Sequence, residues 1–279
     1  MSMDIDAILD RPKRPIPEPQ PLASHGPAHV ISVVNQKGGV GKTTTTVSLG
    51  AALAEYGRRV LIVDFDPQGA LSVALGLNPN ELGLTVYNLL SDPSCNVREV
   101  IRKTEQGNLD LLPSNIDLAA AELQLVSEVG REHALARALE PVLADYDIIL
   151  IDCQPSLGLL TLNALSASTG VIVPLECEYF ALRGVALLTE TIEKVKGRLN
   201  PDLEIIGVVA TMYDPRTLHS REVYARVIQA FGDLVFQTAI HRTVKFPDAA
   251  VAGQPIELFA PGSVGAEAYK ALAREVLAR

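Results

Sequence analysis

Short apolar runs alternate with longer segments of helical periodicity along the chain from residue 29 onward. Runs such as Ile148–Ile151 are apolar at every position, which is typical of strands buried on both faces of a sheet. Strands alternating with helices predict an α/β fold with a doubly wound, mostly parallel sheet and helices on both faces. The predicted strands are 29–34, 59–64, 109–112, 147–152, 170–174, 205–211 and 234–239, and the predicted helices are 42–56, 70–76, 85–91, 97–103, 117–126, 131–144, 158–168, 183–197, 219–231 and 263–278.

The first 28 residues differ from the rest because prolines recur between positions 12 and 27. Proline lacks an N–H and restricts φ, so this segment is predicted to be a disordered or extended tail. Ile5, Ile8 and Leu9 have helical spacing, so both a short docking helix and a solvated tail without a partner remain open. Residues 29–279 are predicted to form a single domain.

Composition narrows the class of protein. A chain of 279 residues that is 48% hydrophobic is long enough for one large domain with a full core. The sequence contains no apolar run of the roughly 18–20 residues that a membrane span needs, and the N-terminus has no apolar signal region. Its three scattered cysteines are typical of a reducing cytoplasm, so a cytoplasmic location is expected. The net charge of −9 argues against nucleic-acid binding by the whole surface but leaves room for a local basic patch.

The segment from Lys37 to Thr44 reads Lys-Gly-Gly-Val-Gly-Lys-Thr-Thr, between a predicted strand and a predicted helix. Strand, glycine-rich turn, Gly-Lys-Thr and helix is the arrangement that binds the phosphates of a nucleoside triphosphate. Glycines allow several backbone N–H groups to point at the phosphates. Lys42 is predicted to reach the β- and γ-phosphates, and the hydroxyl of Thr43 to bind Mg²⁺.

Three aspartates lie at the ends of two other predicted strands. Asp64 ends the strand 59–64 and Asp66 follows it, and Asp152 ends the strand 147–152. Ligands of such sheets bind at the carboxyl ends of the strands, and an apolar strand that ends in Asp after a phosphate loop is the Walker B arrangement. A turn or a helix cap is the alternative role for each aspartate taken alone.

With these residues, the sequence resembles the ParA/Soj group of the deviant Walker A ATPases, the P-loop NTPases that also include MinD. The similar blocks extend over residues 29–279. They are Lys37 to Thr44, Val63 to Gly69, Ile151 to Gly158, Pro174 to Arg183, Thr211 to Thr217 and Gly265 to Tyr269.

The resemblance implies a slow, Mg²⁺-dependent ATPase that forms a homodimer in the ATP state. Lys37 would reach across the interface to the partner's nucleotide, and Asp66 would be needed for hydrolysis. The resemblance assigns Lys37, Lys42 and Asp66 to catalysis, Thr43, Asp66 and Asp152 to the metal, and Lys37, Gly38, Gly39, Val40, Gly41, Lys42, Thr43, Thr44, Asp152 and Met212 to the nucleotide. The segments Cys153–Pro155 and His241–Pro247 depart from the pattern of many relatives.

Members of this family bind DNA non-specifically as ATP dimers, and the chain has a local excess of positive charge between residues 216 and 245. Arg221 and Arg226 lie five positions apart on the predicted helix 219–231, broadly toward the same side, although a solvated helix face is the alternative. The predicted DNA-binding residues are Arg216, Arg221, Arg226, Arg242 and Lys245.

Two functions remain open from the sequence. The first is chromosome or plasmid segregation on nucleoid DNA with a ParB-like adaptor, and the second is the positioning of another cargo by an orphan ATPase. A nitrogenase-iron-protein type of enzyme would need cysteines placed for a cluster, and Cys95, Cys153 and Cys177 lack such spacing. The C-terminal helix has mostly small apolar residues, so it is predicted to pack on the protein and not to bind a membrane as in MinD.

Overall fold

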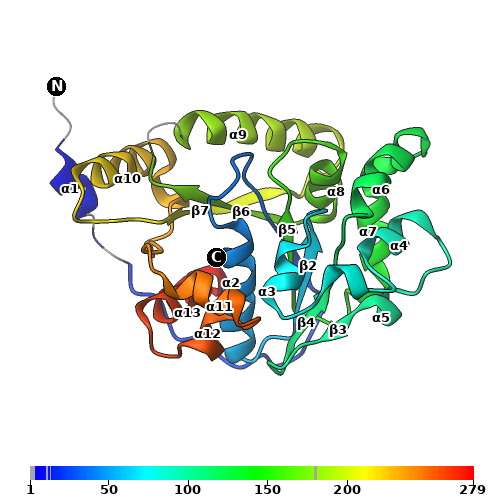
Figure 1. Cartoon of the computed structure of the whole chain (residues 1–279). Coiled ribbons are helices and arrows are strands. Elements are labelled where there is room, and N and C mark those ends of the chain that lie inside the picture. Colours follow the sequence, from blue (N-terminus) through cyan, green and yellow to red (C-terminus); the bar gives the residue numbers. More distant parts are fainter. Residues whose placement is uncertain (1–3, 11, 13, 179–180) are drawn as a thin grey trace.

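The computed structural model describes residues 4–10, 12, 14–178 and 181–279, and these residues form one seven-stranded sheet (Figure 1). Its strand order is β3-β4-β2-β5-β1-β6-β7, with β3 antiparallel to β4 and all other pairs parallel. The mostly parallel sheet is therefore confirmed. The strands are β1 (His29–Val33), β2 (Val60–Phe65), β3 (Arg102–Lys103), β4 (Leu109–Leu112), β5 (Ile148–Cys153), β6 (Gly170–Glu176) and β7 (Glu204–Thr211).

Helices cover both faces of this sheet, as the doubly wound pattern predicts. One apolar core lies between the sheet and the helices α4 to α10, and a second lies between the sheet and the helices α2, α3 and α11 to α13. The α-helices are α1 (Ile5–Leu9), α2 (Lys42–Glu55), α3 (Ala70–Ala74), α4 (Val86–Ser91), α5 (Val97–Val100), α6 (Leu118–Gln124), α7 (Ala134–Leu139), α8 (Leu159–Ala167), α9 (Ala181–Arg198), α10 (Leu218–Phe231), α11 (Lys245–Val251), α12 (Ile256–Phe259) and α13 (Val264–Leu277). Short 3-10 turns are η1 (Pro79–Glu81), η2 (Leu125–Ser127), η3 (Arg131–His133), η4 (Glu140–Val142) and η5 (Gly232–Leu234).

The predicted strand 234–239 is wrong. Val235 forms only an isolated parallel bridge with Val208 of β7. The amide of Phe236 still donates to the carbonyl of Val208 at 2.9 Å. The amides of Gln237 and Thr238 donate instead to the carboxylate of Glu275 in α13 at 2.7 Å each, so they are not available to a strand ladder. A charged side chain from another element therefore interrupts the strand.

Two predicted helices also differ from the structure. The segment 97–103 is helical only to Val100, after which Arg102 and Lys103 pair with β4 as an antiparallel edge strand. The segment 131–144 is divided into η3, α7 and η4. Pro141 in η4 has no N–H to continue the α-helical hydrogen bonds, which accounts for the end of α7. Helices α11 and α12, at 245–251 and 256–259, had not been predicted.

The N-terminal segment lies along the domain in this structure. Helix α1 lies beside α10 in Figure 1, at the position of the apolar residues with helical spacing. Residues 12–28 of the described chain contain no helix or strand, and Ala28 hydrogen-bonds to Leu143 just before β1 begins. The division into a tail of residues 1–28 and a domain of residues 29–279 stays a prediction.

The C-terminal helix packs on the protein, as predicted. Tyr269, Leu272 and Ala273 of α13 are buried in the same core as α2. Within the described residues, no helix combines the length and the apolar character that crossing a bilayer requires.

Glu257 in α12 carries a buried carboxyl group. It is 2% exposed, and neither carboxylate oxygen has a hydrogen-bond partner among the residues that the structure describes. Burial raises the pKa of Glu257 from 4.5 to about 9, and the nearby charge of Glu55 adds to this effect. The side chain is therefore protonated at neutral pH in the folded protein.

We expect Glu257→Gln to stabilise the protein increasingly as pH rises from 5 to 9. Between its unfolded pKa of 4.5 and its folded pKa of about 9, Glu257 binds a proton only in the folded state. The stability of the wild type therefore falls across this range, by at most about 1.4 kcal/mol per pH unit, whereas glutamine does not titrate. Urea unfolding at several pH values would measure the difference, with the exposed Glu267→Gln as the matched control. Parallel stability curves for wild type and Glu257→Gln would contradict the expectation.

Candidate nucleotide site at the carboxyl edge of the sheet

The loop between β1 and α2 has the backbone of a phosphate-binding loop. Gly39 and Gly41 have φ angles of +76° and +84°, a region that side chains with a Cβ disfavour. A Cβ added to Gly38 or Gly39 would meet no heavy atom within 4 Å, so space is open on that side of the loop. Helix α2 begins at Lys42, and its N-terminal N–H groups provide a binding site for an anion.

Lys42 lies beneath this loop with its charge largely removed from solvent. The side chain is 7% exposed, and Nζ donates a hydrogen bond of 3.1 Å to the carbonyl of Lys37. Burial lowers the pKa of Lys42, while the neighbouring carboxyl groups of Asp152 and Asp66 oppose that shift. An ammonium group held against a loop of N–H groups is suited to the β- and γ-phosphates of a nucleotide.

Two buried carboxyl groups lie on neighbouring strands next to the loop, and one of them contacts Thr43. The Thr43 hydroxyl donates to Asp152 Oδ2 at 2.6 Å, and Asp152 lies directly opposite Asp64 in the register of β5 and β2. Burial and the charge of Asp64 raise the pKa of Asp152 to about 8. Burial also raises the pKa of Asp64 to about 6, although Ser72 donates to it from its amide at 2.8 Å and its hydroxyl at 2.7 Å.

These residues fit a divalent cation. Mg²⁺ prefers oxygen ligands, and Thr43 and Asp152 offer a hydroxyl and a carboxylate beside the position for phosphates. The cation would supply positive charge that favours the ionised form of Asp152, and would neutralise the phosphates in turn. The sequence prediction of Thr43 and Asp152 as neighbours in one site agrees with this geometry.

Asp66 follows β2 and stands at the edge of this group. Its backbone N–H donates to Asp64 at 3.4 Å, and its own carboxylate accepts from the amide of Gln68 at 2.9 Å. The charge of Asp66 contributes to the pKa values of both Lys42 and Asp152, which places it near the two side chains. In the described residues its carboxylate makes no hydrogen bond to Thr43 or Asp152, so its assignment to the metal stays a prediction.

Lys37 is held by two carboxylates at the end of β6. Its Nζ donates to Glu176 at 2.8 Å and to Glu178 at 2.5 Å. Burial disfavours the charged form of Lys37, but the hydrogen bonds to Glu176 and Glu178 outweigh it, so the pKa is raised. The side chains of Lys37 and Glu178 are 42% and 54% exposed, so solvent weakens the second ion pair considerably.

The end of β7 completes the wall of the site. Thr211 Oγ1 donates to the carbonyl of Val40 in the phosphate loop at 2.8 Å. Met212 follows with a φ of +51°, an uncommon angle for a residue other than glycine. Arg242 approaches its sulfur, with Nη2 at 3.8 Å from Sδ. Met212 therefore directly follows a residue that contacts the loop, and its contact with the nucleotide stays a prediction.

Several polar residues of the site had not been predicted from the sequence: Ser72, Glu122, Glu176, Glu178 and Thr211. Glu122 in α6 accepts a hydrogen bond of 2.9 Å from the amide of Leu159, so it fixes the start of α8 after the Asp152 loop. Glu176 and Glu178 fall inside the block from Pro174 to Arg183 that resembles the family, and their position at a strand end was a usable signal.

Comparisons with known proteins show the family of the chain. A family model described as "AAA domain" matches residues 28–205. The uncharacterized protein Rv1708 of Mycobacterium tuberculosis is 62% identical over 272 residues, which cover 98% of this chain and 86% of that protein. The sporulation initiation inhibitor protein Soj of Bacillus subtilis is 49% identical over 249 residues, covering 89% of this chain and 98% of Soj. The chain belongs to the ParA/Soj family of ATPases.

A solved structure of the same fold extends the comparison. The structure named cobyrinic acid a,c-diamide synthase from Mycobacterium smegmatis, with bound ADP and magnesium, matches with a TM-score of 0.77 and 46% identity, covering 88% of this chain and 92% of that one. The predicted fold class of the present chain and its predicted ATPase activity are thus confirmed.

Three of the five cations predicted to bind DNA have an acidic partner within the present chain. Arg216 pairs with Asp214 at 2.8 Å, and Arg242 approaches Glu176 at 3.5 Å beside the nucleotide site. Arg221 pairs with Asp6 of α1. Arg226 on α10 and Lys245 at the start of α11 are exposed.

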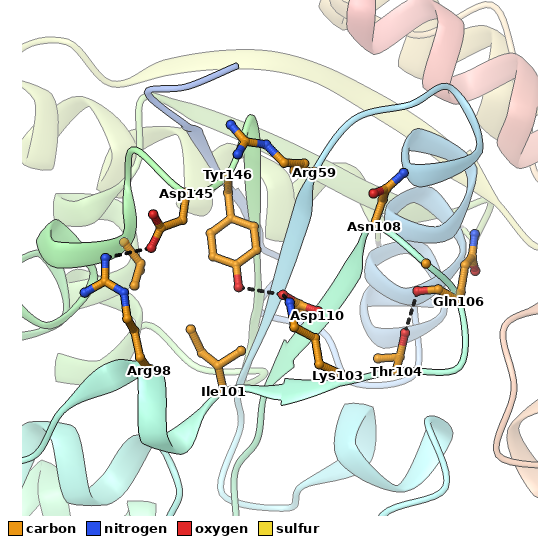
Figure 2. Close-up of a pocket in the computed structure, with 12 residues that line it drawn as sticks. Arg59, Arg98, Ile101, Lys103, Thr104, Gln106, Asn108, Asp110, Asp145 and Tyr146 are labelled. Atoms are coloured by element: carbon orange, nitrogen blue, oxygen red, sulfur yellow. Dashed lines mark hydrogen bonds and ion pairs between the residues drawn. The ribbon is translucent and has the colours of Figure 1, made fainter. Parts of the chain in front are cut away.

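A pocket of about 420 Å³ lies at the opposite, amino edge of the sheet (Figure 2). Tyr146 and Lys103 donate to the same oxygen of Asp110, at 2.7 Å and 2.6 Å, and Arg98 pairs with Asp145 at 2.7 Å. These partners neutralise most of the charge around the pocket. The phosphate loop and its acidic partners lie elsewhere, so this pocket has no part in the nucleotide site.

Proposed function

We propose that this chain is an ATP-dependent dimerising ATPase that binds DNA non-specifically and segregates chromosomes or plasmids with a ParB-like adaptor. It would act in the cytoplasm, on the nucleoid. The observation that carries the proposal is the convergence of Lys42, Thr43 and Asp152 at a phosphate loop, in a chain that aligns with 98% of Soj.

ATP and Mg²⁺ are the cofactors of this ATPase. The related Mycobacterium smegmatis structures contain magnesium with ADP or with an ATP analogue. In this chain, Lys42 and the N–H groups at the start of α2 would hold the phosphates, and Thr43 with Asp152 would hold the cation. Asp66, whose charge acts on both Lys42 and Asp152, would act on the water that hydrolyses ATP.

DNA binding is supported by cations outside the nucleotide site. Arg216 is 87% exposed, and Arg226 and Lys245 are also exposed. Such residues bind phosphates without reading bases, and a dimer would present each of them twice. Arg242 lies beside Glu176 and Met212, so a contribution of this residue to nucleotide binding is the alternative to a DNA contact.

The expected result is ATP-dependent binding to unrelated duplexes that weakens in an Arg226→Ala/Lys245→Ala variant. Two lost phosphate contacts would flatten the slope of log affinity against log salt by about 1.8, because each contact contributes about 0.9. Mobility shifts at several salt concentrations would measure this slope, with Lys194→Ala/Lys196→Ala on α9 as the charge-matched control. Equal slopes in the three proteins would place the DNA site elsewhere. Absence of binding by the wild type would favour the positioning of a cargo on another matrix.

The name of the Mycobacterium smegmatis structure suggests a second candidate, an ATP-dependent synthase. The same phosphate loop would serve that reaction. Phosphate release by this chain that depends on cobyrinic acid and an ammonia source, and that DNA and adaptor leave unchanged, would favour the synthase over the partitioning ATPase.

A further inference from the structure

Helix α1 is held in place by the neighbouring helix α10. It has only five residues, from Ile5 to Leu9, and so short a helix does not persist alone in water. Asp4 caps it by accepting from the amide of Ala7 at 3.1 Å. Ile5, Ile8 and Leu9 are half-buried, and Figure 1 shows α1 lying against α10. The helical form of α1 therefore depends on this docking.

The docked helix brings negative charge to a predicted DNA-binding arginine. The first ten residues contain three aspartates and no lysine or arginine. Asp6 forms an ion pair with Arg221, whose side chain remains 34% exposed. A carboxylate thus stands where a phosphate oxygen would meet this guanidinium group.

Further along the chain, exposed ion pairs continue the attachment. Arg14 pairs with Asp233 just after α10 at 2.7 Å, and Glu18 pairs with Arg274 of α13 at 2.6 Å. The side chains of Arg14 and Asp233 are 75% and 81% exposed, and such pairs contribute little to stability. The segment is therefore attached by several weak contacts.

Packing beneath the segment is also incomplete. A cavity of about 700 Å³ lies between it and the domain. Leu9 and Ile16 line one side, and Tyr213, Tyr224 and Ile228 line the other. A segment that is attached by exposed ion pairs and lies over a cavity loses few apolar contacts when it leaves the domain. Its detachment therefore requires little free energy.

We propose that α1 and DNA compete for Arg221 on α10, so that the N-terminal helix lowers DNA affinity until it is displaced. This inference rests on the proposed DNA-binding function. Binding of DNA would expel α1 by replacing Asp6 with a phosphate, and any partner that held α1 elsewhere would strengthen DNA binding. The carboxylate of Asp6 thus acts as an intramolecular competitor of the DNA phosphate for Arg221.

The test compares Asp6→Ala with Asp10→Ala in the full chain with ATP. Both variants lose one negative charge, but the side chain of Asp10 is exposed and forms no ion pair with the described residues. We expect Asp6→Ala to bind unrelated duplexes about threefold to tenfold more tightly than wild type, because a weak intramolecular competitor is removed. The salt slope would steepen by about 0.9, since Arg221 then releases a counterion on binding phosphate. Asp10→Ala would behave as wild type.

Three further measurements test whether the gain in DNA affinity depends on the docking of α1 and on Arg221. Ile8→Ser/Leu9→Ser, which removes the apolar contacts of α1, would reproduce the gain of Asp6→Ala. In an Arg221→Ala background, Asp6→Ala would have no effect. In wild type, DNA would increase hydrogen exchange at the amides of Ile8 and Asp10, which bond to Asp4 and Asp6 within the helix.

Normal DNA binding with identical affinity and slope in wild type, Asp6→Ala and Ile8→Ser/Leu9→Ser would overturn the competition and leave the proposed function intact. Absence of DNA binding by wild type and all variants would overturn both. Binding by the undocked variants alone would support both.

Discussion

Lys42→Ala is expected to lower ATP affinity by at least about 100-fold. The lysine is buried, and its Nζ lies beneath the loop whose N–H groups receive the phosphates. Removing one partner of a buried, charge-assisted interaction costs about 3 kcal/mol, which corresponds to a factor of about 100 in the dissociation constant. Titration of a fluorescent ATP analogue would measure the loss.

The fold should survive this change. In the structure Lys42 donates only one weakly directed bond, to the carbonyl of Lys37, while the charge of Asp152 is already reduced by its raised pKa. Thermal unfolding without nucleotide would check this, and Lys194→Ala, an exposed lysine of α9, is the control. Addition of ATP should raise the unfolding temperature of wild type and control but not of Lys42→Ala. Equal ATP affinity in Lys42→Ala and wild type would refute the role of Lys42.

Lys37→Ala is expected to retain most ATP affinity and to lose ATP-dependent dimerisation. On its own subunit Lys37 is held by Glu176 and Glu178 and not by the interior of the loop. Because these pairs are partly exposed, the lysine can exchange them for a phosphate of a partner's nucleotide, where a second cation would offset the charge between two subunits. Light scattering with a slowly hydrolysed ATP analogue should show at least a tenfold weaker dimer, equivalent to about 1.4 kcal/mol.

Glu178→Gln is the matched control for the lysine. It removes one of the charges that hold Lys37 on its own subunit and leaves the lysine itself in place. We expect it to dimerise at least as well as wild type. A Lys37→Ala protein that binds ATP and dimerises normally would contradict the role across the interface, and loss of ATP binding in that variant would assign Lys37 to its own nucleotide instead.

The linear order of residues by itself determined the phosphate loop and most of the sheet. A phosphate loop works through consecutive N–H groups and the residues beside them, so all its parts are local in sequence from Lys37 to Thr44. Strands buried on both faces form nearly continuous apolar runs, so β1, β2, β4, β5, β6 and β7 were visible in the sequence. Parallel strands also direct their carboxyl ends to one edge, which is why Thr43 and Asp152 could be placed together.

Only the tertiary structure decided which distant side chains complete these parts. Lys37 meets Glu176 and Glu178 from 139 and 141 positions away, and Asp6 meets Arg221 from 215 positions away. The hydrophobic pattern of the sequence does not predict such pairs, because each pair depends on how two elements approach in space. Glu275 likewise ended the expected strand at 234–239 by taking its amides. Local patterns are set by backbone geometry and burial, whereas charges on separate elements find partners only after the core has brought those elements together.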